Sequence, residues 1–216
     1  MNIKPVWSRL LGCVSLGLGL ILGSGCENND SGVSNDDPGD NDVNVYVAIG
    51  DSLTSGSECN TPPYPAQLAG MLGKTVVNQG SGGEQSGDCA SRAPRVLSRY
   101  KPGFMLILTG VNDIIHRQSS GSAMNNVRSI VRACKANKTV PIVATYPIPR
   151  ASHAMFSGGT ITLNALVRQM ADEEGVPVVD LESEFGDNPD LLMPDGLHPN
   201  VVGTTLMALA FKDVLQ

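Results

Sequence analysis

The stretch Asn44-Val-Tyr-Val-Ala-Ile-Gly-Asp-Ser-Leu-Thr54 decides the fold of this chain. Its apolar and β-branched residues end at Gly50, a turn signal, as in a buried strand of a parallel sheet. Ser52 follows two residues after that glycine. Open α/β sheets bind ligands just beyond the carboxyl ends of their strands. The stretch therefore predicts a strand that brings a hydroxyl group to a binding site.

Further strand and helix patterns alternate along the chain. Strands are expected at 75–77, 104–108, 139–144 and 176–179, and helices at 64–72, about 90–100, 124–135, from Thr160 onward and from near Asn200. A loop rich in Pro, Ser and Gly is expected at 146–159. Such alternation predicts helices on both faces of a parallel sheet. The expected fold class is α/β, a single doubly wound, flavodoxin-like domain at 45–216 with a parallel five-stranded sheet.

The first 25 residues have the composition of an export signal. Lys4 and Arg9 precede a mostly apolar run at 10–22, which is too short to span a bilayer comfortably. Gly23-Ser24-Gly25-Cys26 resembles the lipobox of bacterial lipoproteins, which implies lipid attachment at Cys26. An ordinary secretory signal or an uncleaved anchor are the alternatives. We therefore expect a signal peptide at 1–25.

Asp, Asn, Gly and Ser dominate the segment that follows this signal. Such a segment buries too little apolar surface to offset its ordering entropy. We expect residues 26–44 to be a lipidated cysteine and a disordered acidic tether, holding the domain at the bacterial cell envelope. Secretion is the alternative. The formal net charge of −6 over 216 residues, without a basic patch, argues against nucleic acid as a partner.

Three cysteines fall within the expected domain. Cys134 lies on the apolar face of a helical pattern and is expected to be an inert buried thiol. Cys59 and Cys89 lie in polar segments, each shortly after a proposed site segment. An exported domain meets an oxidising compartment. We expect a Cys59–Cys89 disulfide that pins two loops at the site, with two free thiols as the alternative.

Four polar segments lie at the ends of the expected strands or in the last loop. They are Gly50-Asp51-Ser52-Leu53, the Gly80–Gly83 loop, Gly110-Val111-Asn112-Asp113 and Asp195-Gly196-Leu197-His198. In this order they resemble the four blocks of the SGNH hydrolases, also called the GDSL family, which contribute Ser, Gly, Asn and His. The resemblance covers nearly the whole domain and implies the SGNH hydrolase fold and ester hydrolysis.

The chemistry of ester hydrolysis requires residues of the same types. A serine attacks a carbonyl only when a base takes its proton, and histidine titrates in the useful range. His198 has a carboxylate three residues before it, Asp195, and both lie in the last of the four polar segments. That carboxylate can fix the tautomer of the ring. Ser52, His198 and Asp195 are therefore the candidate catalytic residues.

The resemblance also implies an oxyanion hole. It would consist of the Ser52 N–H, a glycine N–H and the Asn112 side-chain amide. Spacing favours Gly83 as that glycine, with Gly82 and Gly80 left open. Asp51 and Asp113 are expected to hold their turns rather than to act as acid or base. Metal-ligand spacings such as His-Glu-x-x-His are absent, and no metal or other cofactor is expected.

The sequence therefore predicts an exported, lipid-anchored serine esterase. It would act as a monomer on a carboxylic ester or thioester of a small molecule, lipid or carbohydrate. An O-acyltransferase with the same residues and a non-catalytic surface binding module are the alternatives. A flavodoxin-like phosphate binder ranks last, because the glycine-rich loop is not followed by Gly-Lys-Ser/Thr.

Overall fold

The computed structural model of the protein describes residues 32–216. Its five parallel strands form one sheet in the order β2-β1-β3-β4-β5. The strands are β1 (Asp42–Gly50), β2 (Thr75–Gly80), β3 (Pro102–Leu108), β4 (Val140–Ala144) and β5 (Val178–Val179). This is the flavodoxin-like strand order. The predicted five-stranded parallel sheet is confirmed.

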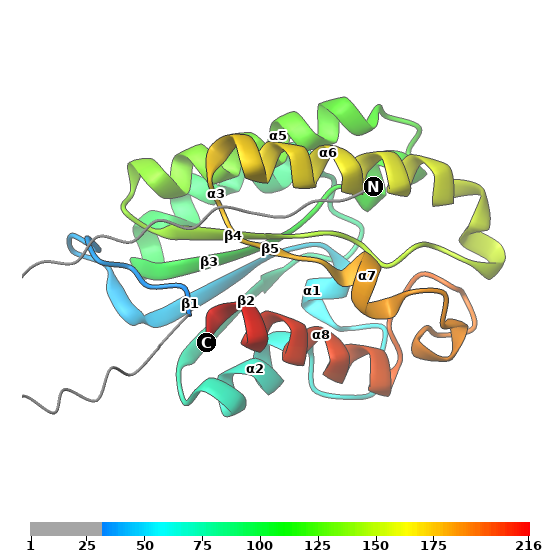
Figure 1. Cartoon of the computed structure of the whole chain (residues 1–216), viewed down its shortest axis with the longest axis horizontal. Helices are drawn as coiled ribbons and strands as arrows, with labels where there is room; N and C mark the ends of the chain where they lie inside the picture. Colours follow the sequence, from blue (N-terminus) through cyan, green and yellow to red (C-terminus); the bar gives the residue numbers. More distant parts are fainter. Residues whose placement is uncertain (1–31) are drawn as a thin grey trace, which may run out of the picture. The chain divides into compact units, whose positions relative to one another are not determined.

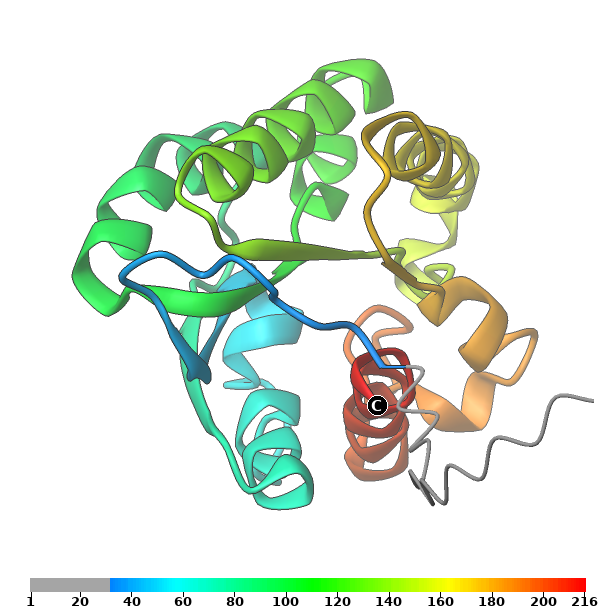
Figure 2. The ribbon, with the colours of Figure 1, turned by 60° about the vertical axis from the view of Figure 1, so that its left-hand side comes forward.

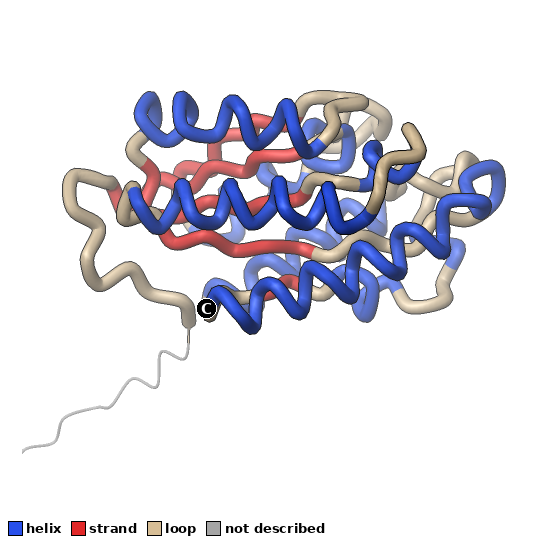
Figure 3. The backbone as a smooth tube through the Cα atoms, turned by 90° about the horizontal axis from the view of Figure 1, so that it is seen from above, coloured by secondary structure: helices blue, strands red, loops and turns tan. Residues whose placement is uncertain are grey.

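Helices cover both faces of the sheet (Figures 1 and 2). One face carries α3 (Ser86–Tyr100), α5 (Ser120–Ala136) and α6 (Ser157–Glu174), and the other carries α2 (Tyr64–Leu72) and α8 (Val201–Leu215). Seen from above, the long helices run alongside the strands (Figure 3). The shorter elements are α1 (Ser52–Ser55), α4 (Val111–Ile115), α7 (Leu181–Phe185) and the 3-10 helices η1 (Ala151–Phe156) and η2 (Pro189–Leu191). In this described region, every helix is too short or too polar to cross a membrane.

The apolar runs of the sequence form the core between these layers. β3 is buried along its whole length because it lies between β1 and β4 and is covered on both faces. The second half of β1 is buried in the same way. On the opposite side from α5, α2 packs on α8 through the rings of Tyr64 and Phe211, which stack with centroids 4.8 Å apart. The C-terminal helix is thereby part of the domain core.

The register of the sheet aligns the ends of three strands. Gly50, at the end of β1, pairs with Gly80 of β2 and with Leu108 of β3. A Cβ at Gly50 would lie 2.1 Å from the Leu108 carbonyl oxygen, so only glycine fits there. From β1 the chain first adds β2 on one side of it and then crosses over to add β3 on the other side. Open α/β folds bind ligands at such a switch point. The fold therefore places Ser52, two residues later, where a site is expected.

Residues just before β1 are bound to the domain. The Asn35 side-chain amide donates to the carbonyls of Gly103 and Lys138, at 2.9 and 3.0 Å. The Asn41 amide donates to the Asn137 carbonyl at 2.6 Å. The segment just before β1 is therefore held in place by hydrogen bonds from its asparagine side chains to backbone carbonyls, rather than by buried apolar surface.

The expected boundaries change accordingly. β1 begins at Asp42, not at Val45, and the prediction of a disordered tether is wrong for residues 35–44. Composition alone did not reveal which asparagines meet carbonyl groups. The expected signal peptide at 1–25 and the expected lipid site Cys26 lie outside the described residues.

Two helical segments differ from their sequence-based expectations. α6 begins at Ser157, before the expected cap Thr160, which is buried inside the helix. The Thr160 hydroxyl instead donates to the Phe156 carbonyl at 3.1 Å, the bond to the preceding turn that helical threonines commonly make. η1 lies within the segment expected to be only a loop.

The predicted disulfide is wrong. Among the cysteines that the structure describes, Cys59, Cys89 and Cys134 are all free thiols. Cys89 lies inside α3 and is fully buried, whereas the sequence suggested a polar loop. Burial raises the pKa of the Cys89 thiol to about 12. Cys134 is buried as predicted, and burial raises its pKa as well.

Candidate active site

Ser52 is the first residue of α1, the short helix directly after β1. The Asp51 carboxylate accepts the N–H of Leu53 at 3.0 Å, and the N–H groups of Thr54 and Ser55 bond to the Asp51 carbonyl at 3.2 and 2.9 Å. The first N–H groups of a helix have no partner within the helix. These turn contacts leave the N–H of Ser52 itself available to a ligand. Asp51 thus holds the turn, as predicted.

Three side chains form a continuous hydrogen-bonded chain. His198 Nε2 lies 3.0 Å from Ser52 Oγ, and His198 Nδ1 lies 2.6 Å from Asp195 Oδ2. Ser52 is only 7% exposed and lies in a largely water-shielded position. The arrangement matches a nucleophile, a base and an orienting carboxylate. The structure brings together the three residues that the sequence nominated.

Asp195 is held in its ionised form. Its Oδ1 accepts the N–H groups of Leu197 and His198 at 2.9 and 3.1 Å. Burial acts to raise the pKa of Asp195, but hydrogen bonds from the His198 ring and from these two amides outweigh it, and the pKa is lowered. The carboxylate therefore holds the proton of a neutral His198 on Nδ1. Nε2 is then free to accept the proton of Ser52.

Asn112 lies at the start of α4, directly beyond β3. Its side-chain amide donates to the Glu84 carbonyl at 3.0 Å. Glu84 follows Gly83, which has a φ of +73° and open space where a Cβ would be. Earlier in the same loop, the Ser81 N–H donates to the Gly50 carbonyl at 2.8 Å. The second and third polar segments therefore meet beside the end of β1.

Of the three candidate glycines, Gly80 has a packing role. Its N–H already donates to Asn78 Oδ1 at 2.8 Å. A Cβ on Gly80 would lie 2.1 Å from the Ser55 nitrogen, so glycine is needed for α1 to pack on β2. Gly82 and Gly83 both face open space. Gly83 is favoured because it adjoins Glu84, the partner of Asn112.

An ion pair that the sequence did not single out holds this loop. The Arg92 Nε and Nη2 atoms lie 2.7 and 2.6 Å from the two carboxylate oxygens of Glu84. Arg92 Nη2 also donates to the Gln79 carbonyl at 2.7 Å. Such a two-point pair fixes direction as well as distance. Glu84 lies in a loop and Arg92 in α3, so no helical or strand periodicity links them.

Asp113 also has the supporting role predicted for it. Its two carboxylate oxygens accept the hydroxyl and the N–H of Ser86, at 2.7 and 2.8 Å. Ser86 is the first residue of α3, and its hydroxyl accepts from the Asn126 amide at 2.9 Å. Asp113 thus ties the segment carrying Asn112 to the start of α3.

The turn that carries Asp195 is held by the segment leading into η1. The Arg150 N–H donates to the Gly196 carbonyl at 2.7 Å. The Ser152 hydroxyl and His153 Nδ1 both donate to the Asp195 carbonyl, at 2.9 and 2.8 Å. These partners lie 43 and 42 positions away in the sequence, and no local pattern indicated them.

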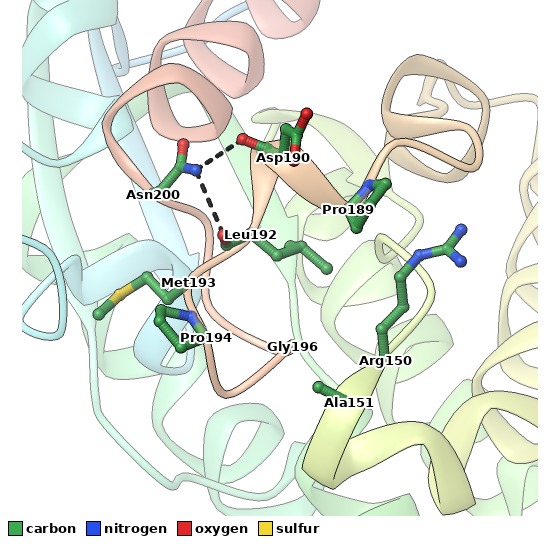
Figure 4. Close-up of a pocket in the computed structure, with 9 residues that line it drawn as sticks. All are labelled: Arg150, Ala151, Pro189, Asp190, Leu192, Met193, Pro194, Gly196 and Asn200. Atoms are coloured by element: carbon green, nitrogen blue, oxygen red, sulfur yellow. Dashed lines mark hydrogen bonds between the residues drawn. The ribbon is translucent and has the colours of Figure 1, made fainter.

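A cavity of about 380 Å³ borders the same turn (Figure 4). Figure 4 shows Arg150 and Ala151 on one side of it, and Met193 and Pro194 on another. Its lining is completed by Pro189, Asp190, Leu192, Gly196 and Asn200, whose amide donates to the carbonyls of Asp190 and Leu192 at 2.7 and 3.2 Å. Neither Ser52 nor His198 lines this space, so the cavity lies beside the reaction centre.

The arrangement is suited to acyl transfer. It offers a nucleophilic hydroxyl and, hydrogen-bonded to it, a base of fixed tautomer. Within residues 32–216, no three His, Cys, Asp or Glu side chains are grouped so that they could hold a metal ion.

Comparison with known sequences places this site in a family. The sequence profile of the GDSL-like Lipase/Acylhydrolase family matches residues 48–206. Thioesterase 1/protease 1/lysophospholipase L1 of Escherichia coli (strain K12) is 26% identical over 162 residues, which cover 73% of this chain and 76% of the relative.

Solved structures agree with this assignment. A putative lipolytic protein of the G-D-S-L family from Desulfitobacterium hafniense DCB-2 has a TM-score of 0.71 and 26% identity, covering 80% of this chain and 99% of that one. An acetylxylan esterase from Geobacillus stearothermophilus shares the fold, with a TM-score of 0.69, 22% identity, and coverage of 79% and 93%. The profile match spans all four polar segments and most of the sheet. The chain therefore belongs to the GDSL-like lipase/acylhydrolase family and is a hydrolase that acts on ester bonds.

Proposed function

We propose that the protein is a serine ester hydrolase that works through Ser52, His198 and Asp195 and forms an acyl-enzyme. The observation that carries this proposal is the unbroken hydrogen-bonded chain from Ser52 Oγ through both ring nitrogens of His198 to Asp195. Family membership gives the reaction class, and this chain of contacts supports the proposed role of each residue.

The reaction follows from the direction of these hydrogen bonds. His198 Nε2 takes the Ser52 proton as Oγ bonds to the ester carbonyl carbon, and Asp195 stabilises the imidazolium that results. The tetrahedral intermediate collapses, the bond to the leaving oxygen or sulfur breaks, and His198 returns the proton to that atom. Water then attacks the acyl group on Ser52 by the same route and releases a carboxylic acid.

The negative oxygen of the intermediate needs hydrogen-bond donors. We assign this role to the N–H groups of Ser52 and Gly83 and to the Asn112 amide. The proximity of Asn112 to the Gly83–Glu84 segment supports the assignment. We expect Asn112→Ala to lower kcat by about 10²–10³-fold, the usual cost of losing one such donor, with little change in thermal unfolding. An unchanged kcat would remove Asn112 from the oxyanion hole.

The substrate class follows by analogy with the relatives. One is named a thioesterase and lysophospholipase and another an acetylxylan esterase, so a thioester, a lipid ester or an acetylated carbohydrate is the proposed substrate. We also propose that the chain is exported and anchored as a monomer through a lipid on Cys26, as the composition of its N-terminus favours. Labelling of full-length protein with a palmitate analogue in bacteria, beside Cys26→Ser, tests the anchor.

Hydrolysis of p-nitrophenyl esters tests the reaction. The purified full-length protein and Ser52→Ala would be assayed with acyl chains of two, four, eight and twelve carbons. Activity that disappears in Ser52→Ala supports the proposal, and the chain-length profile gives the size of the acyl site. Folded wild-type protein without activity on any ester contradicts it. Product analysis with an added alcohol acceptor separates hydrolysis from acyl transfer.

A further inference from the structure

A fully buried acidic contact lies directly behind the nucleophile. The carboxylate of Asp51, the residue before Ser52, has no exposed surface, and Tyr146 is 2% exposed. The Tyr146 hydroxyl donates to Asp51 Oδ2 at 2.5 Å, while Asp51 Oδ1 accepts the Leu53 N–H. The contact links the turn after β1 to the residues just beyond β4, across 95 positions of sequence. The proposed mechanism makes no use of it.

Tyr146 is held in place independently of Asp51. Its N–H donates to Asn164 Oδ1 at 2.9 Å, and the Asn164 amide donates to the Tyr146 carbonyl at 2.8 Å. Asn164 is fully buried in α6. These two hydrogen bonds fix the position of the Tyr146 backbone. The Tyr146 hydroxyl therefore reaches Asp51 from a fixed position rather than from a flexible loop.

The segment that carries Asn112 also affects the pKa of Tyr146. The backbone N–H of Val111 lies where it acts to lower the pKa of Tyr146, against the larger effects of burial and of the Asp51 charge, which raise it. Val111 directly precedes Asn112, and Asp51 directly precedes Ser52. The Tyr146 hydroxyl thus bonds to the neighbour of Ser52, and its pKa also responds to the neighbour of Asn112.

We propose that Tyr146 is a positioning residue that keeps Asp51 fixed and negatively charged behind Ser52, so that Asp51 acts as a second carboxylate on His198. The proposal rests on the proposed function, because it assigns Asp51 an effect on the catalytic base. It adds to the role that Asp51 has in capping α1.

The charge on Asp51 is balanced between opposing effects. Burial raises the pKa of Asp51 to about 6, against hydrogen bonds from Tyr146 and Leu53 and against the attraction of a charged His198, which all lower it. That attraction is mutual, so an ionised Asp51 also stabilises the imidazolium that forms during catalysis. Without the Tyr146 hydroxyl the carboxylate loses a donor, and its pKa rises further.

His198 is the neighbour whose charge changes during catalysis. Glu84 also raises the pKa of Asp51, but it is paired with Arg92. The other titratable neighbours are uncharged near neutral pH, because burial raises the pKa of each; they are Cys89 on α3, Tyr64 on α2 and Tyr146 itself. The charge of Asp51 is therefore felt mainly by the catalytic base.

The pH dependence of kcat/KM tests the proposal with two variants expected to shift in opposite directions. Tyr146→Phe makes Asp51 easier to protonate, so the acid limb should move up by about one pH unit, with its alkaline plateau retained. Asp51→Asn removes the negative charge that favours the imidazolium, so the limb should move down by about one unit and the plateau should fall. If these residues had a purely structural role, both variants would lower the rate, and the acid limb would stay where it is in the wild type.

Tyr100→Phe is the matched control. It also removes a tyrosine hydroxyl that makes a hydrogen bond, to the Gln79 amide at 3.2 Å, but Tyr100 is not a neighbour of Asp51. Its acid limb should equal that of the wild type. If Asp51→Asn does not fold, Tyr146→Phe alone still carries the test. The rate at which a fluorophosphonate labels Ser52, measured across the same pH range, gives a readout that does not depend on ester turnover.

The outcomes separate two failures. Wild-type protein without Ser52-dependent ester hydrolysis contradicts the proposed function. Wild-type activity together with unmoved limbs in a folded Tyr146→Phe variant, both in turnover and in Ser52 labelling, contradicts only the role of Tyr146 and Asp51.

Discussion

The two halves of the active site are built in different ways. The nucleophile half, Ser52 and Asn112, lies at the starts of short helices that directly follow β1 and β3, and its supporting carboxylates are buried. The base half, Asp195 and His198, lies in a turn that is fixed mainly by hydrogen bonds to its backbone. The sheet sets the position of the first half, and a neighbouring segment sets the position of the second. Substitutions should therefore fail in different ways in each half.

Removing one residue from each half should give the largest effect. We expect Ser52→Ala and His198→Ala each to lower kcat by about 10⁶-fold, because either change abolishes the same attack step. The double variant should be no worse than either single variant. Ester hydrolysis with matched thermal unfolding curves measures this. A double variant that loses the product of the two single effects would mean that the halves act independently.

Crowding the base half should cost less. A Cβ at Gly196 would lie 2.2 Å from the Arg150 carbonyl oxygen, and the φ of +72° disfavours alanine there. We expect Gly196→Ala to displace the turn and to lower kcat/KM by about 100-fold, the scale of a displacement near 1 Å. Gly70→Ala is the control, because a Cβ in that part of α2 meets no atom within 4 Å. Equal kinetics for the two variants would show that the turn tolerates displacement.

Removing single supports of the base half should cost less still. Ser152→Ala and His153→Ala each delete one of the two side-chain donors to the Asp195 carbonyl. A typical hydrogen bond contributes about 0.5–1.5 kcal/mol, so each should lower kcat/KM by about two- to tenfold. Ser91→Ala is the control, since that exposed hydroxyl donates to the Asp88 carbonyl on α3. If Ser152→Ala and Ser91→Ala behave alike, this support does not orient the base.

The last expected effect is on stability rather than on rate, and it comes from the nucleophile half. Burial raises the pKa of Asp51 to about 6 in the folded protein, so its ionised form destabilises the fold above that pH. Asp51→Asn should therefore raise the free energy of unfolding at pH 8 by about 1–3 kcal/mol, and this gain should vanish between about pH 6 and pH 4. Urea unfolding of the wild type and of Asp51→Asn, at about pH 8 and at about pH 4, measures this gain in the free energy of unfolding. A stability gain in Asp51→Asn that grows as the pH falls would contradict this prediction.

Sequence reasoning predicted the nucleophile half more completely than the base half. β1 and β3 are continuous apolar runs, and the residues just beyond such runs have a defined place in a parallel sheet. Asp195 and His198 were also found, because they lie three positions apart. Contacts such as those of Ser152 with Asp195, or Tyr146 with Asp51, depend on how distant segments pack. Periodicity carries no information about such contacts.

The same limit explains the two predictions described above as wrong, the disulfide and the disordered tether. Cys89 was assigned to a polar loop because its neighbours are Gly, Asp and Ser. However, α3 begins at Ser86, and Cys89 lies on the face of this helix that points into the core. Asn35 and Asn41 lie in a stretch with the composition of a free tether, yet both meet carbonyl groups of the domain. Each error concerns a residue whose environment is made by a distant part of the chain.

The 146 positions that separate Ser52 from His198 also affect the order of events during folding. His198 lies just before α8, and α8 belongs to the core through the stacked rings of Tyr64 and Phe211. The base therefore reaches the nucleophile only when α8 docks, after the largest loop closure in the site. During synthesis, the emerging chain would remain inert towards esters until this step. Onset of ester hydrolysis would then report completion of the fold.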